Sequence, residues 1–171
     1  MKTGTRSLLF GVHQFLYHPV TVWLAWLRLY GARPTWREAL CILVHDWGYW
    51  GCPEMDGHQG REHPMLGAAI VGRLLGDEYA DLVRYHSRTL AKLHGEWPSK
   101  LAWPDKLHLL YYPRRFYLFL ARLSGELAEY RREAASYTDK CPLSATDEQW
   151  FEWVKAHLRE VAERGAVRGV A

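Results

Sequence analysis

Cysteine is scarce in this sequence and is not arranged for cross-linking. There are three cysteines, an odd number, and no two of them form a CxxC pair. This count argues against a disulfide framework and against a zinc site built from thiolates. Cys41 stands within an apolar run and is expected to be a small core residue. Cysteine usage of this kind is typical of a reducing compartment, so we expect a cytoplasmic protein.

The sequence also lacks a long hydrophobic run. Its longest apolar stretch, residues 19–27, is far shorter than the roughly 20 residues that cross a bilayer. The apolar part of residues 1–20 is broken by Gly11, His13 and Gln14, and no small-residue cleavage site follows it. This pattern is unlike a secretory signal. We therefore expect no membrane-spanning segment and no membrane partner.

A strong charge of one sign is missing as well. The formal net charge is +3 with histidine neutral, which is too weak to indicate nucleic-acid binding. Hydrophobic residues make up 49% and charged residues 24% of the 171 positions, as in ordinary globular proteins. A chain of this length is enough for one domain with a sizeable core. We interpret residues 1–171 as a single domain.

Strand-like alternation is absent, and the periodic segments have helical spacing instead. Pro19 and Gly31 bound one helix, as a first-turn residue and a C-terminal stop. Thr35 and Glu38 form a capping box that starts the next helix. Residues 48–62 contain four glycines and a proline. They predict a long loop of the kind that is often functional.

Further helical patterns complete an all-α bundle of about six to eight helices. The C-terminal helices cover about residues 113–164. Thr146 and Gln149 form a second capping box before the last helix, and Pro104 either starts or kinks a helix. The remaining helical segments are residues 63–76, 77–86, 99–112 and 113–136. The first of these has small residues on one face, which favours close packing of a neighbouring helix, and the last is one long amphipathic helix.

Histidine is unusually frequent, with nine in the chain. On this helix map, five successive helices each offer a histidine, an aspartate or an adjacent pair of the two. His45 and Asp46 directly follow an aliphatic run, where an ionised carboxylate is costly to bury unless it is paired or bound to a cation. Imidazole and carboxylate groups together suit divalent transition metals, and helical bundles build such sites from facing helices. The six candidate ligands are His18, His45, Asp46, His63, His86 and Asp105; the weaker candidates are His13, His58, His94, His108 and His157.

The order of the six ligands, H…HD…H…H…D, resembles the HD-domain superfamily of metal-dependent phosphohydrolases. The matching stretches lie within about residues 13–125 and read "YHPV", "LVHDWGYWG", "EHPMLGAAIVGRLL", "DLVRYHSR" and "WPDKL". The dipeptide HD alone occurs widely by chance, whereas the ordered set is specific. The resemblance implies an HD-like helical bundle as the fold and metal-assisted hydrolysis of a phosphate ester as the activity.

The resemblance also implies a role for each ligand. In that superfamily one metal is bound by the first histidine, the HD pair and the last aspartate, here His18, His45, Asp46 and Asp105. Members with two further histidines, here His63 and His86, bind a second metal, and the aspartate of the pair bridges the ions. Two such ions, about 3.5–4 Å apart, lower the pKa of a bridging water and polarise a phosphoryl oxygen. We expect two divalent transition ions per chain, Fe or Mn first, with Co, Ni and Zn as alternatives.

The catalytic and substrate-binding predictions follow from the same comparison. Asp46 acts through the metals, and Glu62, next to His63, is a candidate general acid or base. Many members have a lysine shortly after the HD pair and this chain has none, so the cation that orients the phosphate comes from elsewhere. The candidate substrate contacts are Lys106, Arg61, Arg114, Arg115, Trp47, Tyr49 and Trp50. Solvated positions for Glu62, Arg114 and Arg115, and core packing for the three rings, are also compatible with the pattern.

The predicted function is hydrolysis of a small phosphorylated metabolite, with a nucleotide as the first choice, by metal-activated water. A di-iron oxygenase is the first alternative, because some relatives with the same six ligands cleave C–C or C–P bonds with O₂. A non-catalytic metal- or nucleotide-binding domain is the second alternative. No nucleic-acid partner is expected, and the sequence leaves homo-oligomerisation open.

Overall fold

The computed structural model describes residues 1–55, 57–136 and 141–163. Within these ranges every regular element is a helix, so the all-α prediction is confirmed, with more helices than expected. None of these helices is long and apolar enough to cross a bilayer. The α-helices are α1 (Thr3–Phe10), α2 (Tyr17–Tyr30), α3 (Trp36–Val44), α4 (His58–Arg61), α5 (Pro64–Leu75), α6 (Asp77–Arg84), α7 (Arg88–His94), α8 (Ala102–Leu107), α9 (Arg114–Ser124), α10 (Glu126–Ser136) and α11 (Asp147–Glu163). The 3₁₀ helices are η1 (Trp47–Tyr49) and η2 (His108–Tyr111).

Helix ends follow the signals in the sequence. The Glu38 amide donates to the Thr35 hydroxyl at 3.3 Å, and the Thr35 amide donates to the Glu38 carboxylate at 2.8 Å. Thr146 and Gln149 make the same exchange before α11, at 2.8 and 3.2 Å. At Gly31 a φ of 63° closes α2. Each box supplies hydrogen-bond acceptors to two backbone amides that the start of a helix leaves unpaired. This fixes where α3 and α11 begin.

The prediction of one long helix over residues 113–136 is wrong. The chain turns at Gly125, whose φ of 89° is a left-handed conformation that disfavours any residue with a Cβ atom. Helix α9 therefore ends at Ser124, and α10 begins at Glu126. A single glycine inside a helical pattern is tolerated in many helices, so the pattern alone does not show the break.

Other differences from the predicted elements are smaller. The loop over residues 48–62 contains part of η1 and the whole of α4, and the sequence patterns do not predict α1 or α7. Helix α2 begins at Tyr17, two residues before Pro19. Pro104 lies in the first turn of α8, where its missing amide costs no helical hydrogen bond.

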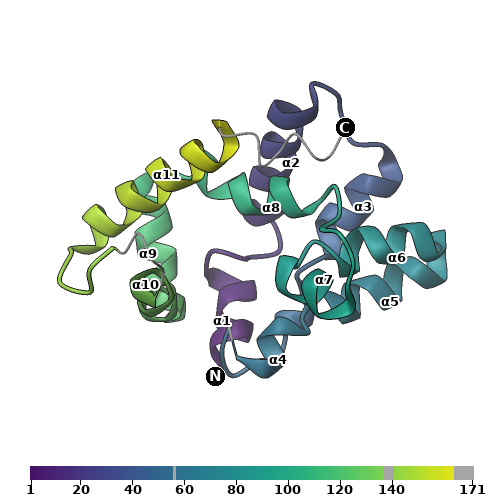
Figure 1. The fold of residues 1–171 in the computed structure, drawn as a ribbon. Coiled ribbons are helices and arrows are strands. Elements are labelled where there is room, and N and C mark those ends of the chain that lie inside the picture. The colour runs from purple at the N-terminus through teal and green to yellow at the C-terminus, as the bar shows by residue number, and fades with distance from the viewer. Residues whose placement is uncertain (56, 137–140, 164–171) are drawn as a thin grey trace.

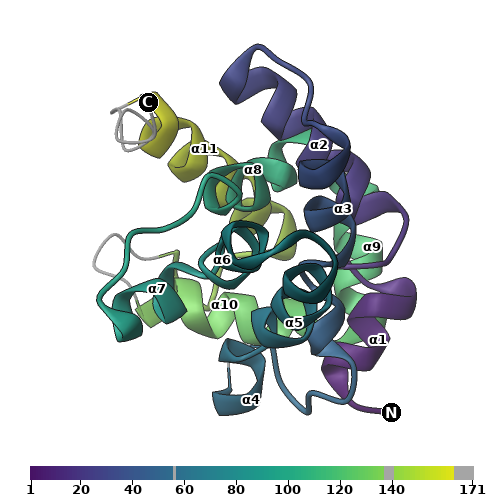
Figure 2. The same cartoon turned by 90° about the vertical axis from the view of Figure 1, so that its right-hand side faces the viewer.

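The C-terminal helices and the helices of the middle segment lie on opposite sides of the molecule. In Figure 1, α9, α10 and α11 stand on one side, α3, α5, α6 and α7 on the other, and α1, α2 and α8 lie between them; Figure 2 gives the view at right angles. One hydrophobic cluster joins α2 to the C-terminal helices and includes Ala25 and Phe151. A second cluster joins α3, α5 and α6 through Val44, Val71 and Val83.

Two glycines allow the backbones around the HD pair to approach closely. A Cβ atom on Gly67 of α5 would lie 2.5 Å from the Val44 carbonyl oxygen, which agrees with the small-residue face expected on this helix. A Cβ atom on Gly48 would lie 1.9 Å from the His63 carbonyl oxygen. Both distances are far inside van der Waals contact. The turn after Asp46 and the start of α5 are thus held against each other.

Candidate metal centre

The structure brings the six predicted ligands together. Five of them are buried, and the Asp105 side chain keeps 26% exposure. The site therefore opens to solvent beside Asp105. The ligands come from the second residue of α2 (His18), the turn after α3 (His45 and Asp46), the residue before α5 (His63), the turn after α6 (His86) and α8 (Asp105).

Four of these residues form a first cluster of donor atoms. His18 Nε2 lies 3.1 Å from His45 Nε2, 3.0 Å from Asp46 Oδ2 and 3.4 Å from Asp105 Oδ1. His45 Nε2 lies 3.4 Å from Asp46 Oδ2 and 3.3 Å from Asp105 Oδ1. Two nitrogens and two carboxylate oxygens thus surround one point.

The other oxygen of Asp46 belongs to a second cluster. Asp46 Oδ1 lies 3.3 Å from His63 Nε2 and 3.4 Å from His86 Nε2. The two imidazole nitrogens are themselves 3.0 Å apart. Each carboxylate oxygen of Asp46 therefore faces a different pair of histidines, so that this one side chain belongs to both clusters.

These separations fit donor atoms around an ion. Two atoms that are each about 2.1 Å from one metal lie about 3.0 Å apart at a right angle and about 3.4 Å apart at the tetrahedral angle. Every separation given above falls between 3.0 and 3.4 Å. The two clusters have the size of two coordination spheres.

Local backbone structure fixes the tautomer of three ligand histidines. The Nδ1 atoms of His45, His63 and His86 lie 2.7, 2.6 and 2.6 Å from backbone carbonyl oxygens three residues earlier. These carbonyls belong to the ends of α3, α4 and α6, where a helix leaves carbonyl groups without amide partners. Each ring donates its Nδ1–H there. Its Nε2 lone pair is left to face the cluster, as metal-binding histidines require.

The arrangement is unfavourable without a positive charge in it. His63 and His86 point two Nε2 lone pairs at each other across 3.0 Å. Asp46 Oδ2 is buried and makes no hydrogen bond to the described residues, although His18 Nε2 is 3.0 Å away. Facing lone pairs and a buried carboxylate oxygen repel one another unless a proton or a metal ion lies between them. The donor set therefore fits divalent ions at both clusters.

Both carboxylates of the centre are ionised. Burial raises the pKa of the Asp46 carboxyl, but electrostatic attraction from the His45 ring and the contact with His18 help to hold that pKa well below its usual range. Burial acts against the contacts with His18 and His45 at Asp105 too, and the pKa of Asp105 is again well below its usual range. The site carries two negative charges toward any bound cation.

His108 supports the fourth ligand histidine. Its Nδ1 atom lies 2.6 Å from Nδ1 of His18, in place of the carbonyl partner that the other three rings have. Burial, followed by electrostatic repulsion from His18, holds the pKa of His108 well below its usual value, so this ring suits the role of acceptor for the Nδ1 proton of His18. In the sequence His108 is only a weaker candidate, because its position beside His18 depends on how η2 packs against α2.

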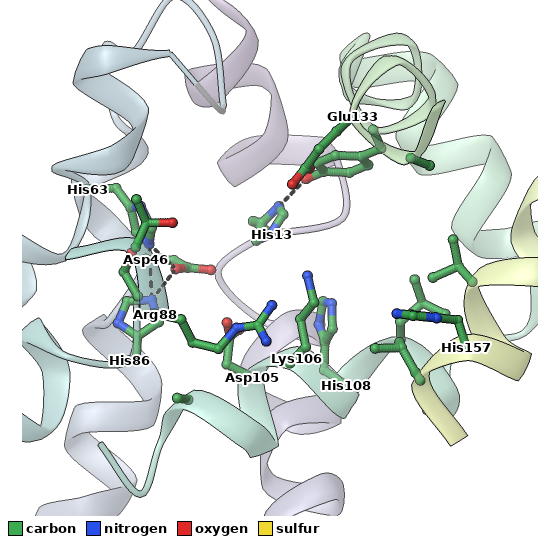
Figure 3. Close-up of a pocket in the computed structure, with 18 of the residues that line it drawn as sticks. His13, Asp46, His63, His86, Arg88, Asp105, Lys106, His108, Glu133 and His157 are labelled. Atoms are coloured by element: carbon green, nitrogen blue, oxygen red, sulfur yellow. Dashed lines mark hydrogen bonds and ion pairs between the residues drawn. The ribbon is translucent and has the colours of Figure 1, made fainter. Parts of the chain in front are cut away.

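A cavity of about 870 Å³ adjoins the centre. Asp46, His63, His86 and Asp105 line one part of it, and α10 and α11 supply the facing part with Tyr130, Glu133, Trp150, Trp153 and His157 among others. Figure 3 shows the two parts facing each other across the cavity. The volume is that of a pocket for a ligand of metabolite or drug size.

Three basic side chains line the same cavity. Arg88 and Lys92 come from α7, and Lys106 follows Asp105 in α8. None of the three forms an ion pair with an acidic side chain in the described ranges, and the Arg88 guanidinium lies 5.6 Å from the Trp103 ring. The side chains of Arg88 and Lys106 extend beside Asp105 into the cavity (Figure 3). The cavity thus offers free positive charge next to the candidate metal centre.

Two of the predicted substrate contacts line the cavity, Lys106 and Tyr49. Tyr49 stacks on the ligand ring of His63, with centroids 4.0 Å apart. The structure does not bring the remaining candidates to the cavity: Trp47 is half-buried beside the α3–α5–α6 cluster, Trp50, Arg61 and Glu62 are exposed, and Arg114 and Arg115 are exposed at the start of α9 beside a separate hollow. Arg88 and Lys92 take their place. Arg88 stands two residues after His86, at the end of the matched stretch "DLVRYHSR", but neither Arg88 nor Lys92 is among the substrate contacts predicted from the sequence.

Comparisons with protein-family models, with curated proteins and with solved structures found no match to this chain. The functional interpretation therefore depends on the geometry of the site and on the sequence resemblance.

Proposed function

We propose that this chain is a metal-dependent phosphohydrolase of the HD type that binds two divalent transition ions. The observation that supports this most directly is the position of the Asp46 carboxylate, whose two oxygens face two separate histidine pairs. His18, His45, Asp46 and Asp105 would hold one ion, and Asp46, His63 and His86 the other. Bound at such ligands, divalent ions activate water and polarise a phosphoryl oxygen. Fe and Mn are our first choice of metal.

The cavity supports a phosphorylated substrate. Arg88, Lys92 and Lys106 present cationic groups beside the centre, and guanidinium and ammonium groups bind phosphate oxygens well. We infer that Arg88 and Lys106 orient the phosphoryl group and offset its charge. This replaces the lysine that many HD-type enzymes have after the HD pair. The facing aromatic side chains Trp150 and Trp153 suit a base-sized group, so we retain a nucleotide as the first substrate to test.

The same ligands would also serve a di-iron oxygenase. The basic side chains beside the centre help to distinguish a phosphohydrolase from an oxygenase. An anionic phosphate ester uses the positive charge of Arg88 and Lys106, whereas O₂ does not. The positive charge in the cavity thus favours hydrolysis of a phosphate ester over reaction with O₂. The three cysteines are free and buried, which agrees with our proposal of a cytoplasmic location.

Metal content per chain is the first measurement. Protein purified without added metal or chelator is analysed by plasma mass spectrometry beside Asp46→Ala and, as a control, Asp81→Ala, which removes an acid of α6 that is not in the centre. We expect about two equivalents of Fe or Mn in the wild type and in the control, and none in Asp46→Ala. Full metal content in Asp46→Ala would contradict the dinuclear centre.

The reaction class is tested on the loaded protein. Phosphate release from a panel of nucleoside monophosphates with Mn²⁺ is compared with oxygen uptake with Fe²⁺. Phosphate release without oxygen uptake supports the proposal. Oxygen uptake alone would favour the oxygenase, and a folded protein that takes up no metal would leave a binding module.

A further inference from the structure

A buried carboxylate outside the metal centre is held by an unusually complete set of hydrogen bonds. The Glu126 side chain has no exposed surface. The Val12 amide donates to its Oε1 at 2.6 Å, and the Ser124 hydroxyl donates to the same oxygen at 2.8 Å. Its Oε2 accepts from the hydroxyls of Ser7 at 2.7 Å and Tyr130 at 2.9 Å. A buried carboxylate is costly unless it is satisfied in this way.

Two backbone features bring this carboxylate into place. Gly125 turns the chain between α9 and α10, so that Glu126 starts a new helix and points toward α1. Gly11 leaves room for it, because a Cβ atom on Gly11 would lie 2.7 Å from Glu126 Oε1. Four segments of the chain, at α1, at Val12, at the end of α9 and in α10, thus converge on one acid.

Glu126 contacts a histidine of the cavity wall, His13. His13 Nδ1 lies 3.1 Å from Glu126 Oε2, and the ring is a wall of the cavity beside the metal centre. Its centroid is 5.0 Å from that of the ligand His18 and 5.4 Å from that of Tyr49. In Figure 3 the ring of His13 lies across the cavity from His63 and His86, with the Asp46 carboxylate between. With Nδ1 turned to Glu126, the opposite nitrogen Nε2 is left for the cavity.

We propose that His13 is a catalytic residue that gives a proton to the leaving oxygen of the phosphate ester, and that Glu126 is the positioning residue that orients it. This inference rests on the proposed phosphohydrolase function. As water adds to phosphorus, the bond from phosphorus to the ester oxygen breaks and its electron pair passes to that oxygen. His13 enters the step as an imidazolium with a proton on each nitrogen. The oxygen takes the Nε2 proton of His13 and leaves as an alcohol. The ring is then a neutral imidazole that keeps its Nδ1–H on Glu126, and water returns the Nε2 proton afterwards.

Glu62, the acid or base that the sequence suggested for this step, is exposed and does not line the cavity. His108 lines the cavity, but the group behind its ring is the imidazole of His18 and not a carboxylate. His13 combines a position on the cavity wall with a carboxylate behind the ring, the arrangement that orients an imidazole for proton transfer.

The leaving group distinguishes this role from a structural one. His13→Asn is the main variant, because its amide keeps an N–H group toward Glu126 and removes only the cavity-side nitrogen. Two substrates of similar shape are compared, p-nitrophenyl phosphate, whose phenolate leaves without a proton, and phenyl phosphate, whose leaving oxygen is more basic. A general acid contributes about 10²–10⁴-fold. We expect kcat on phenyl phosphate to fall by about 100-fold or more in His13→Asn, and kcat on p-nitrophenyl phosphate by less than about tenfold.

Controls separate the inference from the function on which it rests. His94→Asn, at the exposed end of α7 and outside the cavity lining, should change neither rate. Equal losses on both substrates in His13→Asn, with wild-type metal content, would overturn the role of His13 and leave the phosphohydrolase intact. No phosphate release from any ester by the metal-loaded wild type would overturn both.

A second readout needs no turnover. Ring ¹⁵N spectra of histidine-labelled protein should show hydrogen on Nδ1 of His13 in the wild type, and Glu126→Gln should change that signal and impose the same leaving-group dependence. A His13 ring with a bare Nδ1 in the wild type would contradict the proposed orientation.

Discussion

The Nδ1 atoms of His18 and His108 lie 2.6 Å apart, so one of the two rings donates a proton to the other. Because the Nε2 atom of His18 faces the first cluster, the donated proton is the one on its Nδ1. His108 then carries its own proton on Nε2. The orientation of a ligand in the first cluster thus depends on a neutral imidazole, whereas the other three ligand rings depend on the backbone.

His108→Phe should therefore weaken the first metal site selectively. Loss of a hydrogen-bond partner behind a metal-binding histidine typically costs about 10–100-fold in affinity. Titration of the apoprotein with Mn²⁺ or Zn²⁺ against a competing chelator measures this change. His157→Phe, which alters another histidine of the cavity wall that does not contact a ligand, serves as the control. Equal weakening in both variants would contradict the role of His108.

Gly48→Ala should disrupt the second metal site through the backbone. The new Cβ atom would lie 1.9 Å from the His63 carbonyl oxygen, which no side-chain adjustment can relieve. We expect a loss of about 3 kcal/mol in the free energy of unfolding, the upper end of what overpacked cores typically cost, and loss of one metal equivalent. Gly31→Ala is the control, since its φ of 63° is strained but nothing lies near it. That variant should cost about 1 kcal/mol and keep both ions.

Arg88→Ala should weaken the binding of phosphate more than the binding of metal. A charge-assisted hydrogen bond is worth about 1.5–3 kcal/mol, so KM for a phosphate ester and the inhibition constant of inorganic phosphate should rise about 10–100-fold. Metal content should not change, because Arg88 is not a ligand. Arg73→Ala on α5, outside the cavity lining, is the matched control. Unchanged phosphate inhibition in Arg88→Ala would rule out the proposed contact.

Acid should release the ions within the range where histidine titrates. Burial lowers the pKa of His18 and of His86, but hydrogen bonds to Asp105 and Asp46 respectively outweigh it, so both pKa values are raised in the metal-free protein. A raised pKa means that protons compete with the ions already above the usual value of about 6.5, and more strongly as the pH falls. We expect full metal content after desalting at pH 8 and little at pH 5. Circular dichroism checks that the fold persists, and full retention at pH 5 would contradict the histidine ligands.

The candidate metal centre could be predicted from sequence because its six side chains follow a specific order along the chain. The fold class followed from helical spacing, and the capping boxes at Thr35 and Thr146 gave the starts of α3 and α11. Helical spacing and capping boxes depend on residues that are only a few positions apart. They can therefore be recognised in the sequence alone.

The rest of the site depends on contacts between distant segments. The Arg88 guanidinium lies 5.6 Å from the Trp103 ring of α8, and His13 contacts an acid more than 100 residues away. The break at Gly125, which places that acid, looks in sequence like one tolerated glycine. Helical periodicity does not report contacts between distant segments, so from the sequence His13 is only a weaker candidate and Arg88 has no predicted role.

The bridging position of Asp46 has a consequence for folding as well as for chemistry. The six ligands span residues 18–105, so an ion bound there ties together segments that the unfolded chain keeps far apart. Closing a loop of that length by a cross-link removes about 4–5 kcal/mol of chain entropy from the unfolded state, on the model used for disulfides. Bound metal would thus act as a reversible cross-link in a chain whose described cysteines are free. Removal of the metal with a chelator should make the protein easier to digest with proteases as well as inactive.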